Sequence, residues 1–351
     1  MGRALEKTLA QKRMNRIYEL LDENALLKLF QKELTPLFPD YGAVSRVTVK
    51  PYKKLIWETT YHVVIGFRVY FNNGQKERRV PIVCSAHSDE PRRNVYEALK
   101  YFEKTNFSGD GVDVPRPLFY SDYFRGTFYQ EIEGENLLHY IKSNQRQEIE
   151  SIILAAGKLF AKLHSLPTVG ANINPQNALI KTVLPGVEVI FKEIADRYQD
   201  KYNNDLEKIY NYLMAAENRF RMKGQYDYVI HGDAHPENII RTAPNRIGLI
   251  DFTDLCVGDF ARDLGSFSQQ LEYRIGGKLG DAVFATKMKD LFLSAYLEAS
   301  NRDLTAELSE RINIYYQWTA IRTATYWFLK FGHDENRANE LLKKVKNNLG
   351  L

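Results

Sequence analysis

The pattern of apolar and polar residues along the chain changes near residue 40. Residues 4–34 repeat apolar side chains at helical spacing, which predicts a helix that ends at Pro36 and Pro39. From Val44 onward apolar residues alternate with polar ones and are often β-branched or aromatic, which is typical of strands. The three predicted strands are VSRVTVK, YHVVIGFRVYF and RRVPIVCSA. Asn73-Gly74, between the second and the third, predicts a hairpin because both residues tolerate positive φ.

The remaining pattern divides the chain into a sheet-rich part and a helical part. A helix over 90–104 and strands over 117–123 and 127–132 follow the first three strands, and Glu133-Gly134 forms a joint. Beyond the joint, helices are predicted over 147–166, within 181–223 and from 259 onward, with a strand over 228–230 and a hairpin of 238–241 and 246–250. We therefore expect an α+β chain of three parts. They are an N-terminal helical extension (1–40), an N-lobe with a five-stranded antiparallel sheet and one helix (41–132), and a mostly helical C-lobe (133–351).

Length and composition exclude several classes of protein. The 351 residues are too many for one compact core and suit two unequal lobes. The net charge of +4, without a long basic run, argues against a nucleic-acid partner. Cys84 and Cys256 lie among apolar neighbours, so we expect two buried, reduced thiols. No stretch approaches the roughly 20 apolar residues of a membrane span. We expect a cytoplasmic protein without a membrane partner, and no feature indicates its oligomeric state.

The chemistry is concentrated in the segment His231-Gly232-Asp233-Ala234-His235-Pro236-Glu237-Asn238 and in Asp251, which follows the second arm of the predicted hairpin. Phosphoryl transfer needs hard oxygen ligands for magnesium and a carboxylate that orients the attacking hydroxyl. Asp233, Asn238 and Asp251 supply such a set. Antiparallel arms place the start of one beside the end of the next, so Asn238 and Asp251 are expected to meet around one cation.

These segments resemble those of the aminoglycoside phosphotransferase and choline kinase-like family. HGDAHPEN matches the family's HGDxHxxN catalytic loop, IDFTD resembles its form of the kinase D-F-G motif, and GDFARDL (258–264) its Gly-Asp-Pro-x-x-Asp-Leu segment. The resemblance covers about residues 44–300 and implies a protein-kinase-like two-lobed fold that uses ATP and magnesium. It implies that Asp233 is the catalytic base and that Asn238 and Asp251 are magnesium ligands. Within the same catalytic segment, His231 is expected to support the loop by hydrogen bonding.

The expected nucleotide site departs from the kinase pattern. Kinases hold the ATP phosphates with a lysine on the third strand, paired to a helix glutamate. The glutamate candidate is Glu97 or, less well, Glu90, but Ser85 or Cys84 stands where the lysine is expected. Groups that could substitute are His87, Lys53, Lys54 and Lys76. Adenine is expected against the backbone of Gln130, Glu131 and Ile132, in a hinge that continues to Leu137.

Two functions from different classes remain open. The favoured one is phosphorylation of a hydroxyl on a small molecule such as an aminoglycoside, an amino alcohol or a sugar-type metabolite. The alternative is a nucleotide-binding pseudokinase or scaffold, because the third-strand lysine is missing. Acidic candidates for an aminoglycoside site are Asp254, Glu272 and Glu237. A choline site would need a cage of aromatic side chains, but we expect the many aromatic residues of the C-terminal helices to pack in the core.

Overall fold

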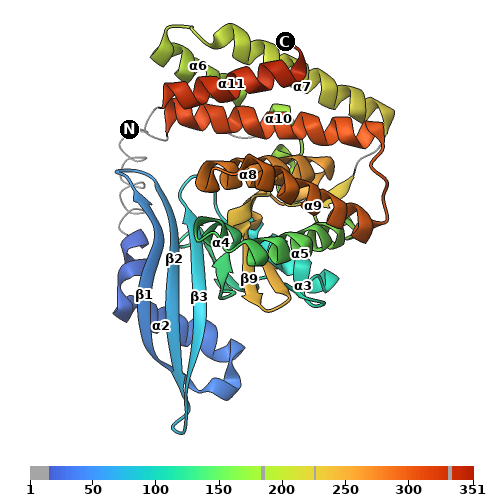
Figure 1. The fold of residues 1–351 in the computed structure, drawn as a ribbon. Helices are drawn as coiled ribbons and strands as arrows, with labels where there is room; N and C mark the ends of the chain where they lie inside the picture. The colour runs from blue at the N-terminus through green and yellow to red at the C-terminus, as the bar shows by residue number, and fades with distance from the viewer. Residues whose placement is uncertain (1–15, 183–185, 225–226, 331–333) are drawn as a thin grey trace. The chain divides into compact units, whose positions relative to one another are not determined.

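The computed structural model of the chain describes residues 16–182, 186–224, 227–330 and 334–351. These residues form two compact units (Figure 1). The first unit contains the chain up to residue 108 together with 113–133 and 250–253, and the second contains 109–112, 134–249 and 254–351. Residues 4–15 of the first predicted helix lie outside the described residues. The domain boundary expected at 132–133 stays a prediction.

The first unit is built on the predicted five-stranded antiparallel sheet, whose order is β1-β2-β3-β6-β5. The strands are β1 (Ala43–Ile56), β2 (Tyr61–Asn72), β3 (Glu77–His87), β5 (Arg116–Ser121) and β6 (Gly126–Gln130). The predicted hairpin joins β2 to β3. Gly74 adopts the expected positive φ of 85°, whereas Asn73 contributes its side chain, which accepts the amides of Gln75 and Lys76. β1 extends six residues beyond the predicted strand and so brings Lys53 and Lys54 into the sheet.

The two faces of this sheet have opposite character because side chains alternate along each strand. The helix α2 (Glu23–Leu34) covers the apolar face, where Phe30 packs edge-on against Phe67 and Phe128. The same buried cluster includes the odd-numbered residues of β2 and the even-numbered residues of β3 from Val80 to Ala86. The other face therefore carries His62, Val64, Gly66 and Arg68 of β2 together with the odd-numbered residues of β3. We call this second face the open face of the sheet.

The helix α3 (Arg93–Thr105) holds residues 250–253 in the first unit. Phe102 packs on Phe252 with ring centroids 4.6 Å apart, and Asn94 donates a hydrogen bond of 2.7 Å to the carbonyl of Thr253. The helix begins at Arg93, three residues later than predicted, and ends at Asn106 in the left-handed conformation. As a result the IDFTD segment is fixed from Ile250 to Thr253 by apolar packing and by a backbone contact.

The second unit is mostly helical, as predicted. Its helices are α4 (Leu137–Lys142), α5 (Arg146–His164), α6 (Val187–Tyr198), α7 (Asn203–Lys223), α8 (Ala261–Leu279), α9 (Ala282–Ser300), α10 (Ala306–Leu329) and α11 (Glu335–Leu349). Short strands form two small sheets, ordered β4-β10-β9-β7 and β11-β8. They are β4 (Val112–Asp113), β7 (Glu135–Asn136), β8 (Tyr228–Ile230), β9 (Ile239–Ala243), β10 (Arg246–Leu249) and β11 (Cys256–Gly258). Figure 1 shows α11 lying along α10, and α8 beside α9.

Two expectations about the whole chain can be compared with the structure. Cys84 and Cys256 are both buried and unpaired with each other, as expected for reduced thiols. In the described part of the chain no helix combines the length and apolarity that crossing a membrane requires.

Candidate functional site

The predicted catalytic loop, residues 231–238, begins where β8 ends, and the buried side chain of Asp263 accepts hydrogen bonds from its first two residues. β8 pairs with β11, and Asp263 lies in the first turn of α8 a few residues later. Its carboxylate accepts the backbone amides of His231 at 2.7 Å and Gly232 at 3.0 Å. His164 of α5 lies 3.1 Å away on the same carboxylate and 3.0 Å from the Tyr296 hydroxyl. Asp263 therefore braces the loop, and His164 is packed between two hydrogen-bond partners.

Gly232 is required by the tight course of this loop. Its φ is 81°, and a Cβ at this position would lie 2.3 Å from the carbonyl oxygen of Asp254. Real Cβ atoms do not approach backbone that closely, so a side chain here would displace the loop or the Asp254 segment. Asp254 itself is half-buried and accepts a hydrogen bond from Asn177. This contact engages a carboxylate that was a candidate for an aminoglycoside site.

Asp233 presents an accessible carboxylate on a fixed backbone. Its amide donates to the ring of His231 at 3.3 Å, which is the supporting role expected of that histidine. The side chain keeps 44% of its surface exposed, so a substrate hydroxyl can reach it. Partial desolvation of the carboxylate would raise its pKa, but the hydrogen bond and charge of His235, followed by the charges of Arg322 and His231, lower the pKa below the usual value. The group is thus an ionised acceptor well below neutral pH.

Asn238 is a buried amide at the end of the same loop. Its nitrogen donates to the backbone carbonyl of Asp233 at 3.0 Å, which leaves the amide oxygen as the atom not used by this contact. An oxygen of this kind is the ligand type that Mg²⁺ accepts. Next to Asn238, Glu237 forms an ion pair of 3.2 Å with Arg274 of α8. That pair ties the loop to the helix and occupies a carboxylate that was a candidate for the acceptor site.

Asp251 lies in the first unit and has an unusual backbone. Its φ is 62°, in the left-handed region that residues other than glycine rarely adopt. Such strain is concentrated at functional positions. Its side chain is exposed, and Oδ1 accepts both the Thr253 hydroxyl at 2.8 Å and the Thr253 amide. Oδ2 makes no hydrogen bond within the described residues, so it is the carboxylate oxygen left for a ligand.

The predicted hairpin connects these segments along the chain. In the second unit Ile239 of β9 pairs with Leu249 of β10, so the residue after Asn238 lies opposite the last residue of β10. Asp251 follows Leu249 by two residues. No group of three or more His, Cys, Asp or Glu side chains within the described ranges is arranged to hold a metal.

The predicted hinge has a definite hydrogen-bond pattern. Gln130 pairs with Ile82 on one side and Arg116 on the other, and the amide of Glu131 donates to the Pro81 carbonyl at 3.0 Å. The sheet therefore uses these two positions, and Ile132 is the first residue beyond it. The carboxylate of Glu131 accepts the Tyr52 hydroxyl and the Arg68 guanidinium, each at 2.6 Å. These contacts fix its side chain on the open face.

The structure shows which residues stand near the β3 position where kinases carry a lysine. Cys84 belongs to the apolar cluster under α2, so Ser85 is the β3 residue that occupies the position on the open face. Glu97 is exposed on α3 and shows no ion pair within the described residues, so its role stays a prediction. Glu90 pairs with Arg92 at 3.2 Å. Burial, followed by the charge of Arg92, lowers the pKa of His87, and its Nδ1 accepts the amides of Asp89 and Glu90, so His87 is not the replacing cation.

Two features near the predicted residues were not found from the sequence. Arg322 of α10 acts electrostatically on Asp233, but nothing in the helical pattern distinguishes it from other exposed-looking cations. Lys53 of β1 lies 3.4 Å from His62 of β2, across two neighbouring strands. A bulge between Pro51 and Lys53 sets that register, and an alternation of residue types does not reveal a bulge.

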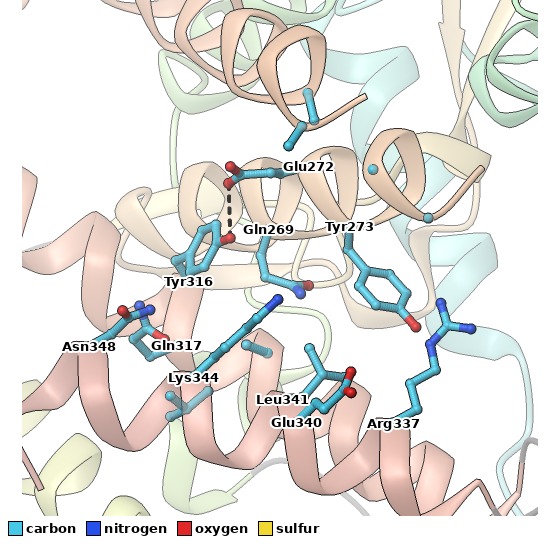
Figure 2. Close-up of a pocket in the computed structure, with 16 residues that line it drawn as sticks. Gln269, Glu272, Tyr273, Tyr316, Gln317, Arg337, Glu340, Leu341, Lys344 and Asn348 are labelled. Carbon is cyan, nitrogen blue, oxygen red and sulfur yellow. Dashed lines mark hydrogen bonds between the residues drawn. The ribbon is translucent and has the colours of Figure 1, made fainter. Parts of the chain in front are cut away.

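A cavity of about 460 Å³ lies among α8, α10, α11 and the start of α9 (Figure 2). Figure 2 shows Glu272 hydrogen-bonded to Tyr316, and Lys289 pairs with the same carboxylate at 3.1 Å. Arg337 lies over the rings of Tyr273 and Trp327, with distances of 5.3 and 4.2 Å to their centroids. The protein's own cations thus occupy both the acidic and the aromatic candidates here, and no residue of loop 231–238 lines the cavity.

The fold and the HGDxHxxN loop together define a kinase-like phosphotransferase. A profile of the Phosphotransferase enzyme family matches residues 65–304, more than half of the chain, so the chain belongs to that family. Among curated proteins no sequence match is found.

Solved structures confirm the predicted two-lobed kinase-like fold. The ADP-bound aminoglycoside phosphotransferase APH(2'')-Ib is 16% identical with a TM-score of 0.52, and the match covers 90% of this chain and 96% of that one. The choline kinase LicA from Streptococcus pneumoniae is 14% identical with a TM-score of 0.53, and the coverage is 92% and 98%. A thermostable mutant of aminoglycoside phosphotransferase APH(4)-Ia is 13% identical with a TM-score of 0.54, and the coverage is 91% and 98%.

Proposed function

We propose that this protein is an ATP- and magnesium-dependent phosphotransferase whose acceptor is a hydroxyl group of a small molecule. The observation that carries the proposal is Asp233, an accessible carboxylate with a lowered pKa on a loop that Asp263 and His231 hold in place. Two of the similar structures are an ADP-bound aminoglycoside phosphotransferase and a choline kinase, which supports a nucleotide donor and a small acceptor.

We assign Asp233 the role of orienting the acceptor hydroxyl and accepting its hydrogen bond. Because the carboxylate is ionised at neutral pH, it can take the proton as the oxygen attacks. The amide oxygen of Asn238 and Oδ2 of Asp251 are proposed as magnesium ligands, since each is the oxygen that its side chain does not commit to another contact. Bound magnesium supplies neutralisation of charge on the phosphate oxygens. Ile132, just beyond the last sheet hydrogen bond, is proposed to offer its backbone to adenine, between the neighbouring hinge residues Gln130 and Glu131.

The alternative is a nucleotide-binding protein without turnover, and the absence of a lysine from β3 favours it. The two functions differ in one measurable respect. A phosphotransferase consumes ATP in the presence of the right acceptor, whereas a scaffold binds ATP and consumes none. A panel of amino alcohols, aminoglycosides and sugars, with release of ADP as the readout, distinguishes them.

The decisive variant is Asp233→Asn, which keeps the size of the side chain and removes the charge. We expect turnover to fall by at least about a hundredfold, the usual contribution of a positioned base. The dissociation constant for MgATP, measured by calorimetry, should stay within a few-fold of wild type. Asp196→Asn is the matched control, because Asp196 forms only an exposed pair with Lys192. Normal turnover in Asp233→Asn would contradict the role given to this residue.

A further inference from the structure

A cluster of nitrogen-bearing side chains occupies one end of the open face. His62 of β2 pairs in register with His87 of β3, and their ring centroids are 4.9 Å apart. Lys53 of β1 places Nζ 3.4 Å from Nε2 of His62. Arg92, immediately before α3, has a nearly buried guanidinium whose charge acts on both rings. We call these four residues the basic cluster.

Within the cluster, Arg92 has a donor that no contact in the described part of the chain uses. Arg92 pairs with Glu90 through Nη1, but its Nε is buried and has no hydrogen-bond partner in the described part of the chain. Burial, followed by the charges of Lys53, Arg92 and His87, lowers the pKa of His62 to about 4, while Asp251 acts in the opposite direction. The cations Lys53 and Arg92 therefore both face these rings, together with the carboxylates of Glu90, Asp89 and Asp251. Asp251, the proposed magnesium ligand, shares this electrostatic neighbourhood within the first unit.

Register decides which lysine belongs to the cluster. Lys53 lies opposite Val64, two residues from His62 on the open face, whereas Lys54 lies opposite Val63 on the face covered by α2. Lys76 lies in the β2–β3 turn, and that turn is ten residue pairs from the His62–His87 pair. Ten residues of strand span about 33 Å, so Lys76 is too far away. Of the three lysine candidates from the sequence, only Lys53 lies on the open face next to His62.

We propose that Lys53, supported by His62 and Arg92, replaces the missing β3 lysine and contacts the phosphates of the bound nucleotide. The inference rests on the proposed function, because it names residues that would hold the donor of the same reaction. Phosphate oxygens accept charge-assisted hydrogen bonds from ammonium and guanidinium groups. Val64 of β2 lies between Lys53 of β1 and Ser85 of β3 in the register of the sheet. The proposed phosphate-binding cation of this chain is therefore on β1, two strands away from the β3 position that kinases use.

The test compares two ligands that differ only in phosphate. Lys53→Met should weaken binding of MgATP by roughly tenfold to a hundredfold, the usual worth of a hydrogen bond to a charged group. Binding of adenosine, which has no phosphate, should change less than twofold. Lys54→Met is the matched control and should leave both affinities at the wild-type values. Calorimetry measures these affinities without any acceptor, so the result does not depend on turnover.

Lys53→Gln, which keeps a polar side chain without the charge, replaces Lys53→Met in this test if that variant proves unstable. A double variant tests the position of the cation. Lys53→Met combined with Ser85→Lys returns a lysine to β3 and should recover most of the lost MgATP affinity, with circular dichroism confirming the fold. If Lys53→Met bound MgATP as tightly as the wild-type protein does, this inference would be overturned and the proposed function would stand. Failure of the wild-type protein to bind MgATP would overturn both.

Discussion

At the scale of single residues, Asp263 fixes the catalytic loop through backbone contacts. Its two oxygens accept the amides of His231 and Gly232, and His164 pairs with one of the same oxygens. The side chain is fully buried, so these donors replace all of its hydration. The position of Asp233, the next residue, then follows from peptide geometry and needs no contact from the substrate.

We expect Asp263→Asn to destabilise the protein by roughly 1–3 kcal/mol, because an amide NH2 in place of one carboxylate oxygen leaves a buried backbone donor of the loop unsatisfied. The free energy of unfolding in urea measures this loss. Asp196→Asn removes an exposed carboxylate and should cost less than about 1 kcal/mol. A loss in Asp263→Asn no larger than that of the control would show that Asp263 does not brace the loop.

The same variant has a defined pH dependence. Burial would raise the pKa of Asp263, but the hydrogen bond and charge of His164, followed by His231, lower it below the usual value. A group with a lower pKa in the folded state contributes fully above its unfolded pKa of about 3.9 and loses its contribution as the pH falls toward the folded pKa. The stability difference between wild type and Asp263→Asn should therefore be constant from pH 7 to 5 and shrink below pH 4.

At the scale of elements, residue patterns predicted the strands well because one face of the sheet is buried. Alternation in β2 and β3 follows directly from α2 covering the odd residues of one and the even residues of the other. The end of β1 was missed because Lys53 and Lys54 lie on an exposed, bulged stretch where neither face imposes a pattern. The segment 231–238 was found from the sequence because its motif is local, and its catalytic role stays a prediction. The basic cluster was not found from the sequence, since it depends on the register between three strands.

The α2 helix should stabilise the sheet without contributing to nucleotide binding. Phe30 is fully buried between Phe67 and Phe128, so Phe30→Ala should lower the free energy of unfolding by roughly 3–5 kcal/mol. The affinity for MgATP should change less than threefold, because α2 covers the face opposite the basic cluster. Lys28→Ala, at an exposed position of the same helix, should change stability by at most about 0.5 kcal/mol. A large loss of MgATP affinity in a folded Phe30→Ala variant would contradict nucleotide binding on the open face.

At the scale of the whole molecule, the proposed functional residues are divided between the two units. The second unit carries Asp233 and Asn238 on a loop braced by α5 and α8. The first unit carries Asp251, the hinge and the basic cluster. The acceptor could not be predicted from the sequence, because two of the acidic residues that suggested one pair with the protein's own cations, Glu272 with Lys289 and Glu237 with Arg274. Side-chain pairing of this kind depends on the packing of distant helices.

Metal-dependent binding of the nucleotide should appear as stabilisation of the folded protein. A ligand that binds only the folded state at a hundred times its dissociation constant stabilises it by about 2.7 kcal/mol, so MgATP should raise the melting temperature by a few degrees. EDTA should remove most of this shift, because the roles proposed for Asp251 and Asn238 are to hold the metal and not to contact the phosphates directly. Asp251→Ala should behave in MgATP as wild type does in ATP with EDTA, whereas Asp290→Ala, at an exposed position of α9, should keep the full shift. Equal shifts with and without magnesium would remove Asp251 from the metal site and leave the basic cluster as the main contact of the nucleotide phosphates.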